Sequence, residues 1–215
     1  MIDRRELDRA FDERFAPEVK ARLQAARVAV AGLGGLGSNI AVMLARSGVG
    51  HLKLVDFDRV DTTNLNRQAY GISHIGKYKT DAIREILAEI NPYLDVETVC
   101  VRVTQENAVA LFRGWPLVCE AFDRPENKAL LVRSLLADAP GTLIVSGNGM
   151  AGYGDANDIR TLHPMRRLYL CGDQKTGAEP GMGLLAPRVA VCAGHEANKI
   201  LQLILEQENS TCRTH

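Results

Sequence analysis

A glycine-rich turn between an apolar run and a helical pattern constrains this chain more than any other feature. Residues 28–31 are apolar and include two β-branched valines, as in a buried parallel strand, and a helical apolar pattern follows through Ile40, Met43 and Leu44. The glycines between them are Gly32, Gly34, Gly35 and Gly37. This order predicts a nucleotide-binding βαβ unit, because glycines allow the tight turn and helix N–H groups face a phosphate.

The next predicted strand, residues 51–56, supports this interpretation. It ends in Asp56, an acid in the position that bonds ribose hydroxyls in such units. The alternative is a glycine turn that only packs the first helix onto its strand. Strand, turn, helix and acid in the expected order favour a nucleotide site.

Length and charge narrow the class of protein. The 215 residues suit one α/β domain over residues 1–215. Basic and acidic residues balance at 26 each, so a nucleic-acid partner is not expected. No apolar run approaches the ~20 residues that span a bilayer, and the charged N-terminus resembles no signal peptide. We therefore expect no membrane contact and a cytoplasmic location.

The remaining pattern predicts a doubly wound, Rossmann-like α/β sheet, mostly parallel, with antiparallel strands toward the C-terminus. Residues 1–25 read as a charged helical arm, and Thr104 is expected to cap a short helix that has Glu106 and Asn107 in its first turn. Residues 147–187 are rich in glycine and are predicted to form crossover loops that bind a ligand. The other helices are predicted at residues 77–91, 124–136 and 188–205. The other strands are predicted at residues 96–103, 116–122, 142–146, 158–162 and 168–171.

Polar side chains are expected to converge at the carboxyl edge of this sheet, where open α/β sheets bind ligands. They are Asn64, Arg67 and Gln68 on one loop, Lys79 at a helix start, and Asp123 after a later strand. Two cations, an amide pair and a lone carboxylate suit a nucleotide triphosphate with Mg²⁺, Asp123 being the metal ligand. A dinucleotide hydride carrier needs no such clamp.

Simpler interpretations remain open for each of these residues. Arg67 and Lys79 can be solvated cations, and Asp123 can be the N-cap of the helix that follows. Asp58 and Asp61 can be turn-forming carboxylates.

Six motifs in a fixed order carry a resemblance. They are Gly32-Leu-Gly-Gly-Leu-Gly37, Val55-Asp-Phe-Asp58, Asn64-Leu-Asn-Arg-Gln68, Gly76-Lys-Tyr-Lys79, Ile90-Asn-Pro92 and Glu120-Ala-Phe-Asp123. Together they closely resemble the ThiF/MoeB/HesA adenylyltransferases, relatives of the ubiquitin-activating enzymes. Two later stretches, Met150-Ala-Gly-Tyr-Gly154 and residues 180–188, resemble most the short, zinc-free ThiF branch.

The resemblance implies an activity. Such enzymes use Mg-ATP to adenylylate the C-terminal Gly-Gly carboxylate of a ubiquitin-like sulfur carrier such as ThiS, a β-grasp protein of thiamine thiazole biosynthesis. Asp56 would hold the ribose, and Asn64, Arg67 and Lys79 would orient the phosphates. The four glycines, Asp58 and Gln68 complete the expected nucleotide site, and Asp123 would bind Mg²⁺. The flexible tail is expected to lie among the glycines of residues 147–154 and 177–183.

Arg14 and the cysteines complete these expectations. Arg14 matches an arginine that family members insert into the partner subunit's ATP site, so the resemblance implies a homodimer. None of the five cysteines forms a C-x-x-C pair, so neither zinc nor a disulfide framework is expected. Cys119 and Cys192 are expected to be inert core, and Cys171 to end a strand rather than form a thioester. Lys128 is a further candidate phosphate ligand.

Three other functions compete with this one. The first is ATP-dependent activation of a carboxylate on a modified tRNA, as in the dehydratase relatives of ThiF. The second is an NAD(P)-dependent oxidoreductase, which the first βαβ unit alone allows. The third is a binding module without catalysis.

Overall fold

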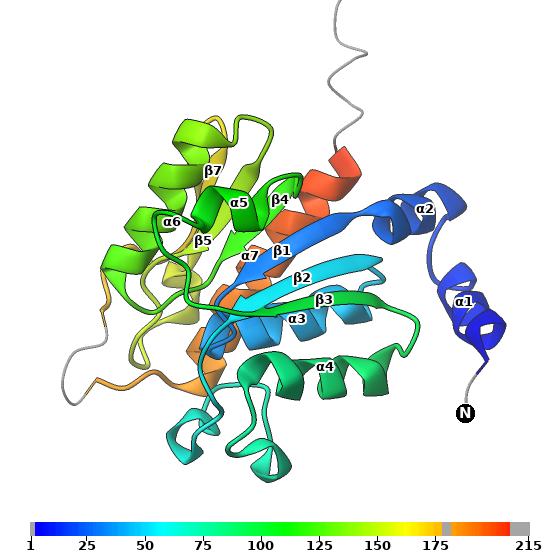
Figure 1. Ribbon diagram of the computed structural model, residues 1–215, viewed down its shortest axis with the longest axis horizontal. Helices are drawn as coiled ribbons and strands as arrows, with labels where there is room; N and C mark the ends of the chain where they lie inside the picture. The colour runs from blue at the N-terminus through cyan, green and yellow to red at the C-terminus, as the bar shows by residue number, and fades with distance from the viewer. Residues whose placement is uncertain (1–2, 178–181, 207–215) are drawn as a thin grey trace, which may run out of the picture.

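The computed structural model describes residues 3–177 and 182–206, which contain a seven-stranded sheet in the order β3-β2-β1-β4-β5-β7-β6 (Figure 1). Neighbouring strands are parallel except β6 and β7, which are antiparallel. The strands are β1 (Arg27–Ala31), β2 (His51–Asp56), β3 (Asp95–Cys100), β4 (Leu117–Glu120), β5 (Leu143–Gly147), β6 (Arg160–Met165) and β7 (Leu168–Gly172). The predicted fold class is confirmed.

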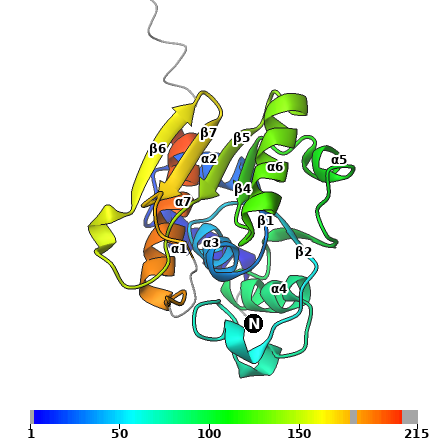
Figure 2. The same cartoon turned by 90° about the vertical axis from the view of Figure 1, so that its left-hand side faces the viewer.

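Helices cover both faces of the sheet (Figure 2). The α-helices are α1 (Arg4–Asp12), α2 (Pro17–Ala25), α3 (Gly35–Arg46), α4 (Lys79–Ile90), α5 (Ala108–Phe112), α6 (Pro125–Asp138) and α7 (Ala186–Glu206). The 3₁₀ turns are η1 (Thr62–Asn64), η2 (Ile72–His74) and η3 (Ala156–Asp158). Helices α3, α4 and α7 lie on one face, and α5 and α6 lie on the other. Among these described helices, none has the length and apolarity needed to cross a membrane.

The period of two along β1 explains the two-sided core. Val28 and Val30 pack toward α3, α4 and α7, while Ala29 and Ala31 pack toward α5 and α6. All four side chains are fully buried. A strand buried on both faces reads as a continuous apolar run, which is why the sequence pattern identified β1.

The beginning of α5 differs from the prediction. The helix starts at Ala108, and its N-cap is Asn107 rather than Thr104. The side chain of Asn107 accepts a hydrogen bond from the backbone N–H of Thr104 at 2.8 Å. The predicted N-cap, Thr104, is therefore wrong, although Thr104 is hydrogen-bonded to the residue that does precede the helix.

The sheet order creates a switch point between β1 and β4. The chain runs outward from β1 through β2 to β3 and then returns to β4 on the other side of β1. Ligands of open α/β sheets bind at this point, beyond the carboxyl ends of the strands. The turns after β1 and β4 meet there, at the edge that faces the viewer in Figure 2.

Candidate nucleotide-binding site

The turn after β1 depends on two glycines that make close backbone approaches. Gly32 has φ +92°, and a Cβ there would lie 2.9 Å from the carbonyl oxygen of Ala121, on the turn after β4. A Cβ at Gly37 would lie 1.8 Å from the carbonyl oxygen of Gly32. Only glycine fits at either position. The two glycines therefore allow the first turn of α3 to pack directly against the end of β1.

We expect Gly37→Ala to destabilise the fold by about 2 kcal/mol, because the added methyl must displace the β1 turn. Gly34→Ala is the matched control, since Gly34 has φ −78° and no atom lies within 4 Å of its Cβ position. Urea unfolding of both variants measures the difference. Equal stability for the two variants would contradict the close approach.

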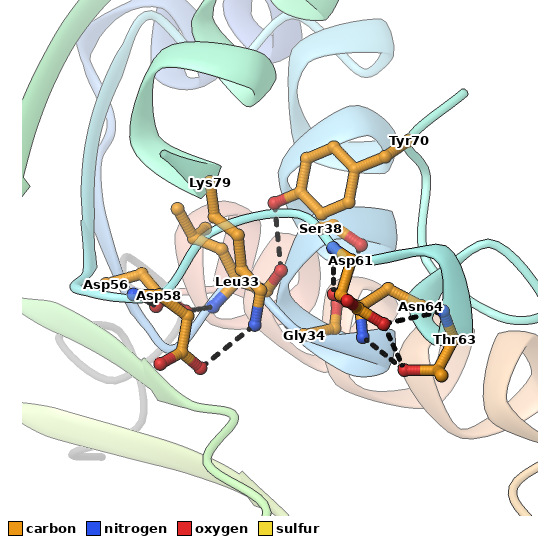
Figure 3. A network of polar contacts seen from close by, with 10 residues as sticks. All are labelled: Leu33, Gly34, Ser38, Asp56, Asp58, Asp61, Thr63, Asn64, Tyr70 and Lys79. Atoms are coloured by element: carbon orange, nitrogen blue, oxygen red, sulfur yellow. Dashed lines mark hydrogen bonds and ion pairs between the residues drawn. The ribbon is translucent and has the colours of Figure 1, made fainter. Parts of the chain in front are cut away.

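Asp56 holds the end of β2 against the same turn (Figure 3). Its Oδ2 accepts a hydrogen bond from the backbone N–H of Leu33 at 2.6 Å, and its Oδ1 accepts one from that of Asp58 at 2.8 Å. The side chain is buried. A carboxylate has about four acceptor positions, so Asp56 retains capacity for ribose hydroxyls.

Lys79 and Asp58 form an ion pair at the start of α4. The Lys79 Nζ lies 3.1 Å from the Asp58 Oδ2, and the lysine side chain is 8% exposed against 49% for the aspartate (Figure 3). The backbone N–H of Lys79 also donates to the Asp58 carbonyl at 2.9 Å. This pair keeps a nearly buried ammonium group beside the glycine turn.

Arg67 and Gln68 carry buried polar atoms that have no hydrogen-bond partner among the described residues. These atoms are the Arg67 Nε and the Gln68 Oε1. The Arg67 stem passes 3.4 Å from the Cβ position of Gly35, the first residue of α3. Its Nη1 donates to the Thr63 carbonyl at 3.1 Å. A guanidinium group therefore lies over a helix N-terminus, where both groups attract anions. These features fit a phosphate ligand.

Asn64 has a structural role in this arrangement. Its Oδ1 accepts a hydrogen bond from the backbone N–H of Asp61 at 3.1 Å, and the two residues form a capping box on η1 (Figure 3). Asp61 also accepts from the Thr63 N–H at 2.9 Å, so it is the turn-forming carboxylate that the sequence allowed. Asn64 lies close to Arg67 along the chain but is engaged in this turn.

Three residues that the sequence interpretation missed fasten the loop of residues 64–70 to the glycine turn. Ser38 donates to the Gly34 carbonyl at 2.7 Å and accepts from the N–H of Ala69 at 3.1 Å. The Asn39 Nδ2 donates to the carbonyl of Arg67 at 3.0 Å. The Tyr70 hydroxyl donates to the Leu33 carbonyl at 2.9 Å. The sequence offered one signal for the first two, because Ser38 and Asn39 are polar residues in the first turns of an otherwise apolar helix.

Asp123 lies on the turn after β4, across the switch point from the glycine turn. Its side chain is exposed. The N-cap of α6 is Arg124, with no side-chain capping bond, so Asp123 does not serve as the cap that the sequence allowed. Within the described ranges, no three His, Cys, Asp or Glu side chains cluster as a metal site. A lone carboxylate nevertheless fits Mg²⁺, which commonly binds one carboxylate plus substrate phosphates and water.

Lys128 does not face the glycine turn as a free cation. Its Nζ lies 2.9 and 3.1 Å from the two carboxylate oxygens of Glu120, at the end of β4. Glu120 is fully buried, and the Lys128 side chain is 19% exposed. The proposed phosphate ligand is thus a counter-ion beneath the site, a pairing across two elements that no local pattern reveals.

Three cysteines are buried in the described part of the chain, and their environment makes them poor nucleophiles. Burial raises the pKa of Cys171 to about 12, and it raises the pKa values of Cys119 and Cys192 well above their ordinary value. Cys171 lies within β7, as expected from the sequence. Inert thiols agree with the expectation for Cys119 and Cys192.

The glycine-rich crossover is held by a second buried ion pair. The Asp173 Oδ2 lies 2.6 Å from the Arg188 Nη2, and Arg188 Nη1 donates to the Asp155 carbonyl at 2.6 Å. Burial raises the pKa of Asp173, but the N–H groups of Thr176 and Lys175, the Thr176 hydroxyl and Arg188 outweigh it and hold that pKa well below its usual range.

The same crossover contacts the loop of residues 64–70. The Asn66 Nδ2 donates to the Leu184 carbonyl at 3.2 Å, and the N–H of Gly152 donates to the Gly183 carbonyl at 2.9 Å. Gly152 and Gly183, one from each glycine-rich stretch, therefore lie beside the segment that contacts the loop of residues 64–70, and residues 178–181 of the second stretch lie outside the described residues.

Arg14 is not part of this assembly within one chain. It is exposed in the turn between α1 and α2. These helices lie beside the amino ends of β1 and β2, at the edge of the sheet opposite the glycine turn (Figure 1).

A glycine turn at a switch point, an acid at the end of β2 and a cationic loop define a nucleotide-binding α/β protein of the Rossmann-like class. The chain belongs to the ThiF family, whose model matches residues 7–215. It is 33% identical over 199 residues to the adenylyltransferase and sulfurtransferase UBA4 of Eremothecium gossypii, covering 88% of this chain and 44% of that protein. It is 36% identical over 148 residues to the tRNA threonylcarbamoyladenosine dehydratase of Haemophilus influenzae, covering 68% and 56%.

The structural comparison agrees with the fold described above. The E. coli tRNA N6-threonylcarbamoyladenosine dehydratase TcdA, solved in complex with ATP, superposes with a TM-score of 0.85 at 22% identity, covering 98% of this chain and 99% of that one. At this identity the likeness shows the fold. The chain spans less than half the length of the UBA4 relative.

Proposed function

We propose that this protein adenylylates a carboxylate with Mg-ATP. A carboxylate oxygen of the acceptor attacks the α-phosphorus, the bond to the β-phosphate oxygen breaks, and pyrophosphate leaves. The proposal is supported by the position of Arg67 and Lys79 around the glycine turn, which packs against the turn after β4 that carries Asp123. The reaction joins two anions, so positioning and charge neutralisation supply most of the acceleration.

Each residue has a role that its contacts support. Asp56 would receive the ribose hydroxyls, while the start of α3, with Arg67 and Lys79, would hold the phosphates. Asp123 would bind Mg²⁺, which when bound neutralises phosphate charge. Asp58 would act by holding Lys79. The family match favours this nucleotidyl transfer over hydride transfer.

ATP–pyrophosphate exchange tests the proposal. The assay compares wild type with Asp123→Ala, with and without a carrier protein that ends in Gly-Gly. We expect acceptor-dependent exchange in the wild type and a loss of about 10²-fold or more in the variant. Exchange that survives intact in a folded Asp123→Ala variant would refute the metal role.

The acceptor that we propose is the Gly-Gly tail of a ThiS-like carrier, in thiamine thiazole formation. Such a tail is narrow, so it needs a channel lined by residues with little or no side chain. The glycines of residues 147–154 lie beside the segment that contacts the loop of residues 64–70. The name of the UBA4 relative supports this acceptor, because the name includes both adenylyl transfer and sulfur transfer.

We expect Gly152→Val to leave AMP binding intact and to lower carrier-dependent exchange by about tenfold or more. The Cβ position of Gly152 lies 3.0 Å from the Met182 side chain, so a branched side chain there would narrow the proposed channel for the tail. Gly152 also has φ +73°, a conformation that favours glycine. Gly141→Val, before β5 and with no atom within 4 Å of its Cβ position, is the control. Unchanged exchange in Gly152→Val would place the tail elsewhere.

A carboxylate on a modified tRNA is the second candidate acceptor. The dehydratase of H. influenzae shares 36% identity with 68% of this chain, which favours it specifically. The balanced charge of the chain favours the protein acceptor. Exchange stimulated by tRNA and not by a Gly-Gly carrier would select this alternative.

We also propose a homodimer that shares its sites. Arg14 lies at the sheet edge opposite its own glycine turn, so it can reach an ATP site only on another copy. Sedimentation equilibrium measures the assembly. A fully active monomer would exclude this role for Arg14.

A further inference from the structure

Glu120 lies fully buried under the turn that carries Asp123. Its Oε1 accepts a hydrogen bond from the backbone N–H of Phe122 at 2.7 Å, and its Oε2 accepts one from the Ser146 hydroxyl at 2.6 Å. The Lys128 Nζ donates to both oxygens, at 2.9 and 3.1 Å. All of these bonds are charge-assisted, and they are stronger in a buried setting than in water.

These bonds join the three segments around Asp123. Phe122 is its immediate neighbour, Ser146 is the penultimate residue of β5, and Lys128 lies near the start of α6. The N–H of Ala121 also donates to the Ala31 carbonyl at 2.8 Å, which fastens the turn to β1. A single carboxylate therefore bonds the backbone just before Asp123 and a side chain five residues after it.

We propose that Glu120, with Lys128 and Ser146, is a positioning group that holds the Asp123 carboxylate in place for the metal of the nucleotide complex. This inference rests on the proposed function, because it takes Asp123 as the metal ligand. Glu120 itself does not touch the nucleotide or the metal. Loss of a group that orients a metal ligand lowers metal affinity by about 10- to 100-fold.

The test measures metal binding rather than turnover. Mn²⁺ binding to the protein–ATP complex is followed by electron paramagnetic resonance, and metal-free AMP binding is followed by calorimetry. We expect Glu120→Gln and Ser146→Ala to weaken Mn²⁺ binding by about tenfold and to change AMP affinity by less than about twofold. Glu120→Gln keeps the shape of the side chain, and Ser146→Ala removes only one bond.

Two further variants complete the design. The double variant Glu120→Gln/Lys128→Met avoids a buried unpaired ammonium, so it keeps the test valid if Glu120→Gln alone does not fold; it too should bind Mn²⁺ about tenfold more weakly. Glu196→Gln changes a buried acid that does not bond this turn, and it should bind Mn²⁺ like the wild type.

Asp123→Ala separates the two possible failures. If Asp123→Ala weakens Mn²⁺ binding while the folded Glu120 and Ser146 variants bind it like the wild type, the positioning role is wrong and the proposed function stands. If Asp123→Ala binds Mn²⁺ like the wild type, the metal role within the proposed function is wrong, and the positioning role falls with it.

Discussion

Replacement of Lys79 by methionine should lower the rate of ATP–pyrophosphate exchange by about 10²- to 10³-fold, the loss that follows removal of one preorganised electrostatic donor. Methionine fills a similar volume, and Asp58, which is 49% exposed, is left in contact with water. The charge that opposes phosphate repulsion is lost without a large cavity. Initial rates of exchange at saturating Mg-ATP measure the effect.

Lys77→Met is the matched control for this variant. Lys77 precedes the same helix, but its Nζ pairs with Glu85 at 2.6 Å on the exposed surface. Its replacement should change the exchange rate by less than about twofold, because exposed ion pairs contribute little. Equal losses in the two variants would mean that net charge, and not the position of Lys79, governs the rate.

The second large effect concerns stability against pH. Glu196 is fully buried in α7, and this burial raises its pKa to about 8. The nearby charge of Lys128 lowers that pKa in part, and the charge of Glu120 raises it. The Sγ of Cys119 lies 3.3 Å from its Oε2. The unfolded chain releases this proton near pH 4.5, so the folded state binds more protons between pH 4.5 and 8. Stability contributed by protonated Glu196 is therefore complete below about pH 4.5 and is lost as the pH rises to about 8.

We expect Glu196→Gln to remove this slope. The free energy of unfolding of the wild type should fall by about 3 kcal/mol between pH 4.5 and 7 because of this residue, and that of the variant should change much less. Urea unfolding at several pH values measures both curves. Glu206→Gln, exposed at the end of the same helix, should follow the wild type. A wild-type slope that persists in Glu196→Gln would refute this assignment.

The elements around the glycine turn were predictable because each has a local cause. Val28 and Val30 lie in a strand buried on both faces, and Gly37 touches the Gly32 carbonyl, so apolar run and glycine spacing both reflect backbone geometry. Asp56 ends β2 as predicted. Parallel strands bring their carboxyl ends to one edge, which is why Asp123 could be placed near the turn from the order of elements alone.

The polar pairs beneath the site were not predictable because their members are far apart in the chain or in different elements. Lys128 was assigned to phosphates because no local pattern places its ammonium on Glu120. Glu196 lies in an apolar helical stripe, and its neighbour Cys119 is contributed by β4. A single acid inside an apolar stripe was the one available signal, and it indicates a buried titratable group without naming its partners.

The central claim is that the switch point grips a triphosphate for attack by a carboxylate. A crystal structure of the protein with Mg²⁺ and a non-hydrolysable ATP analogue tests it most directly. We expect the β- and γ-phosphates between the start of α3 and the side chains of Arg67 and Lys79, with the metal on Asp123. A polyphosphate that points away from Arg67 and Lys79, with no metal at Asp123, would contradict the account.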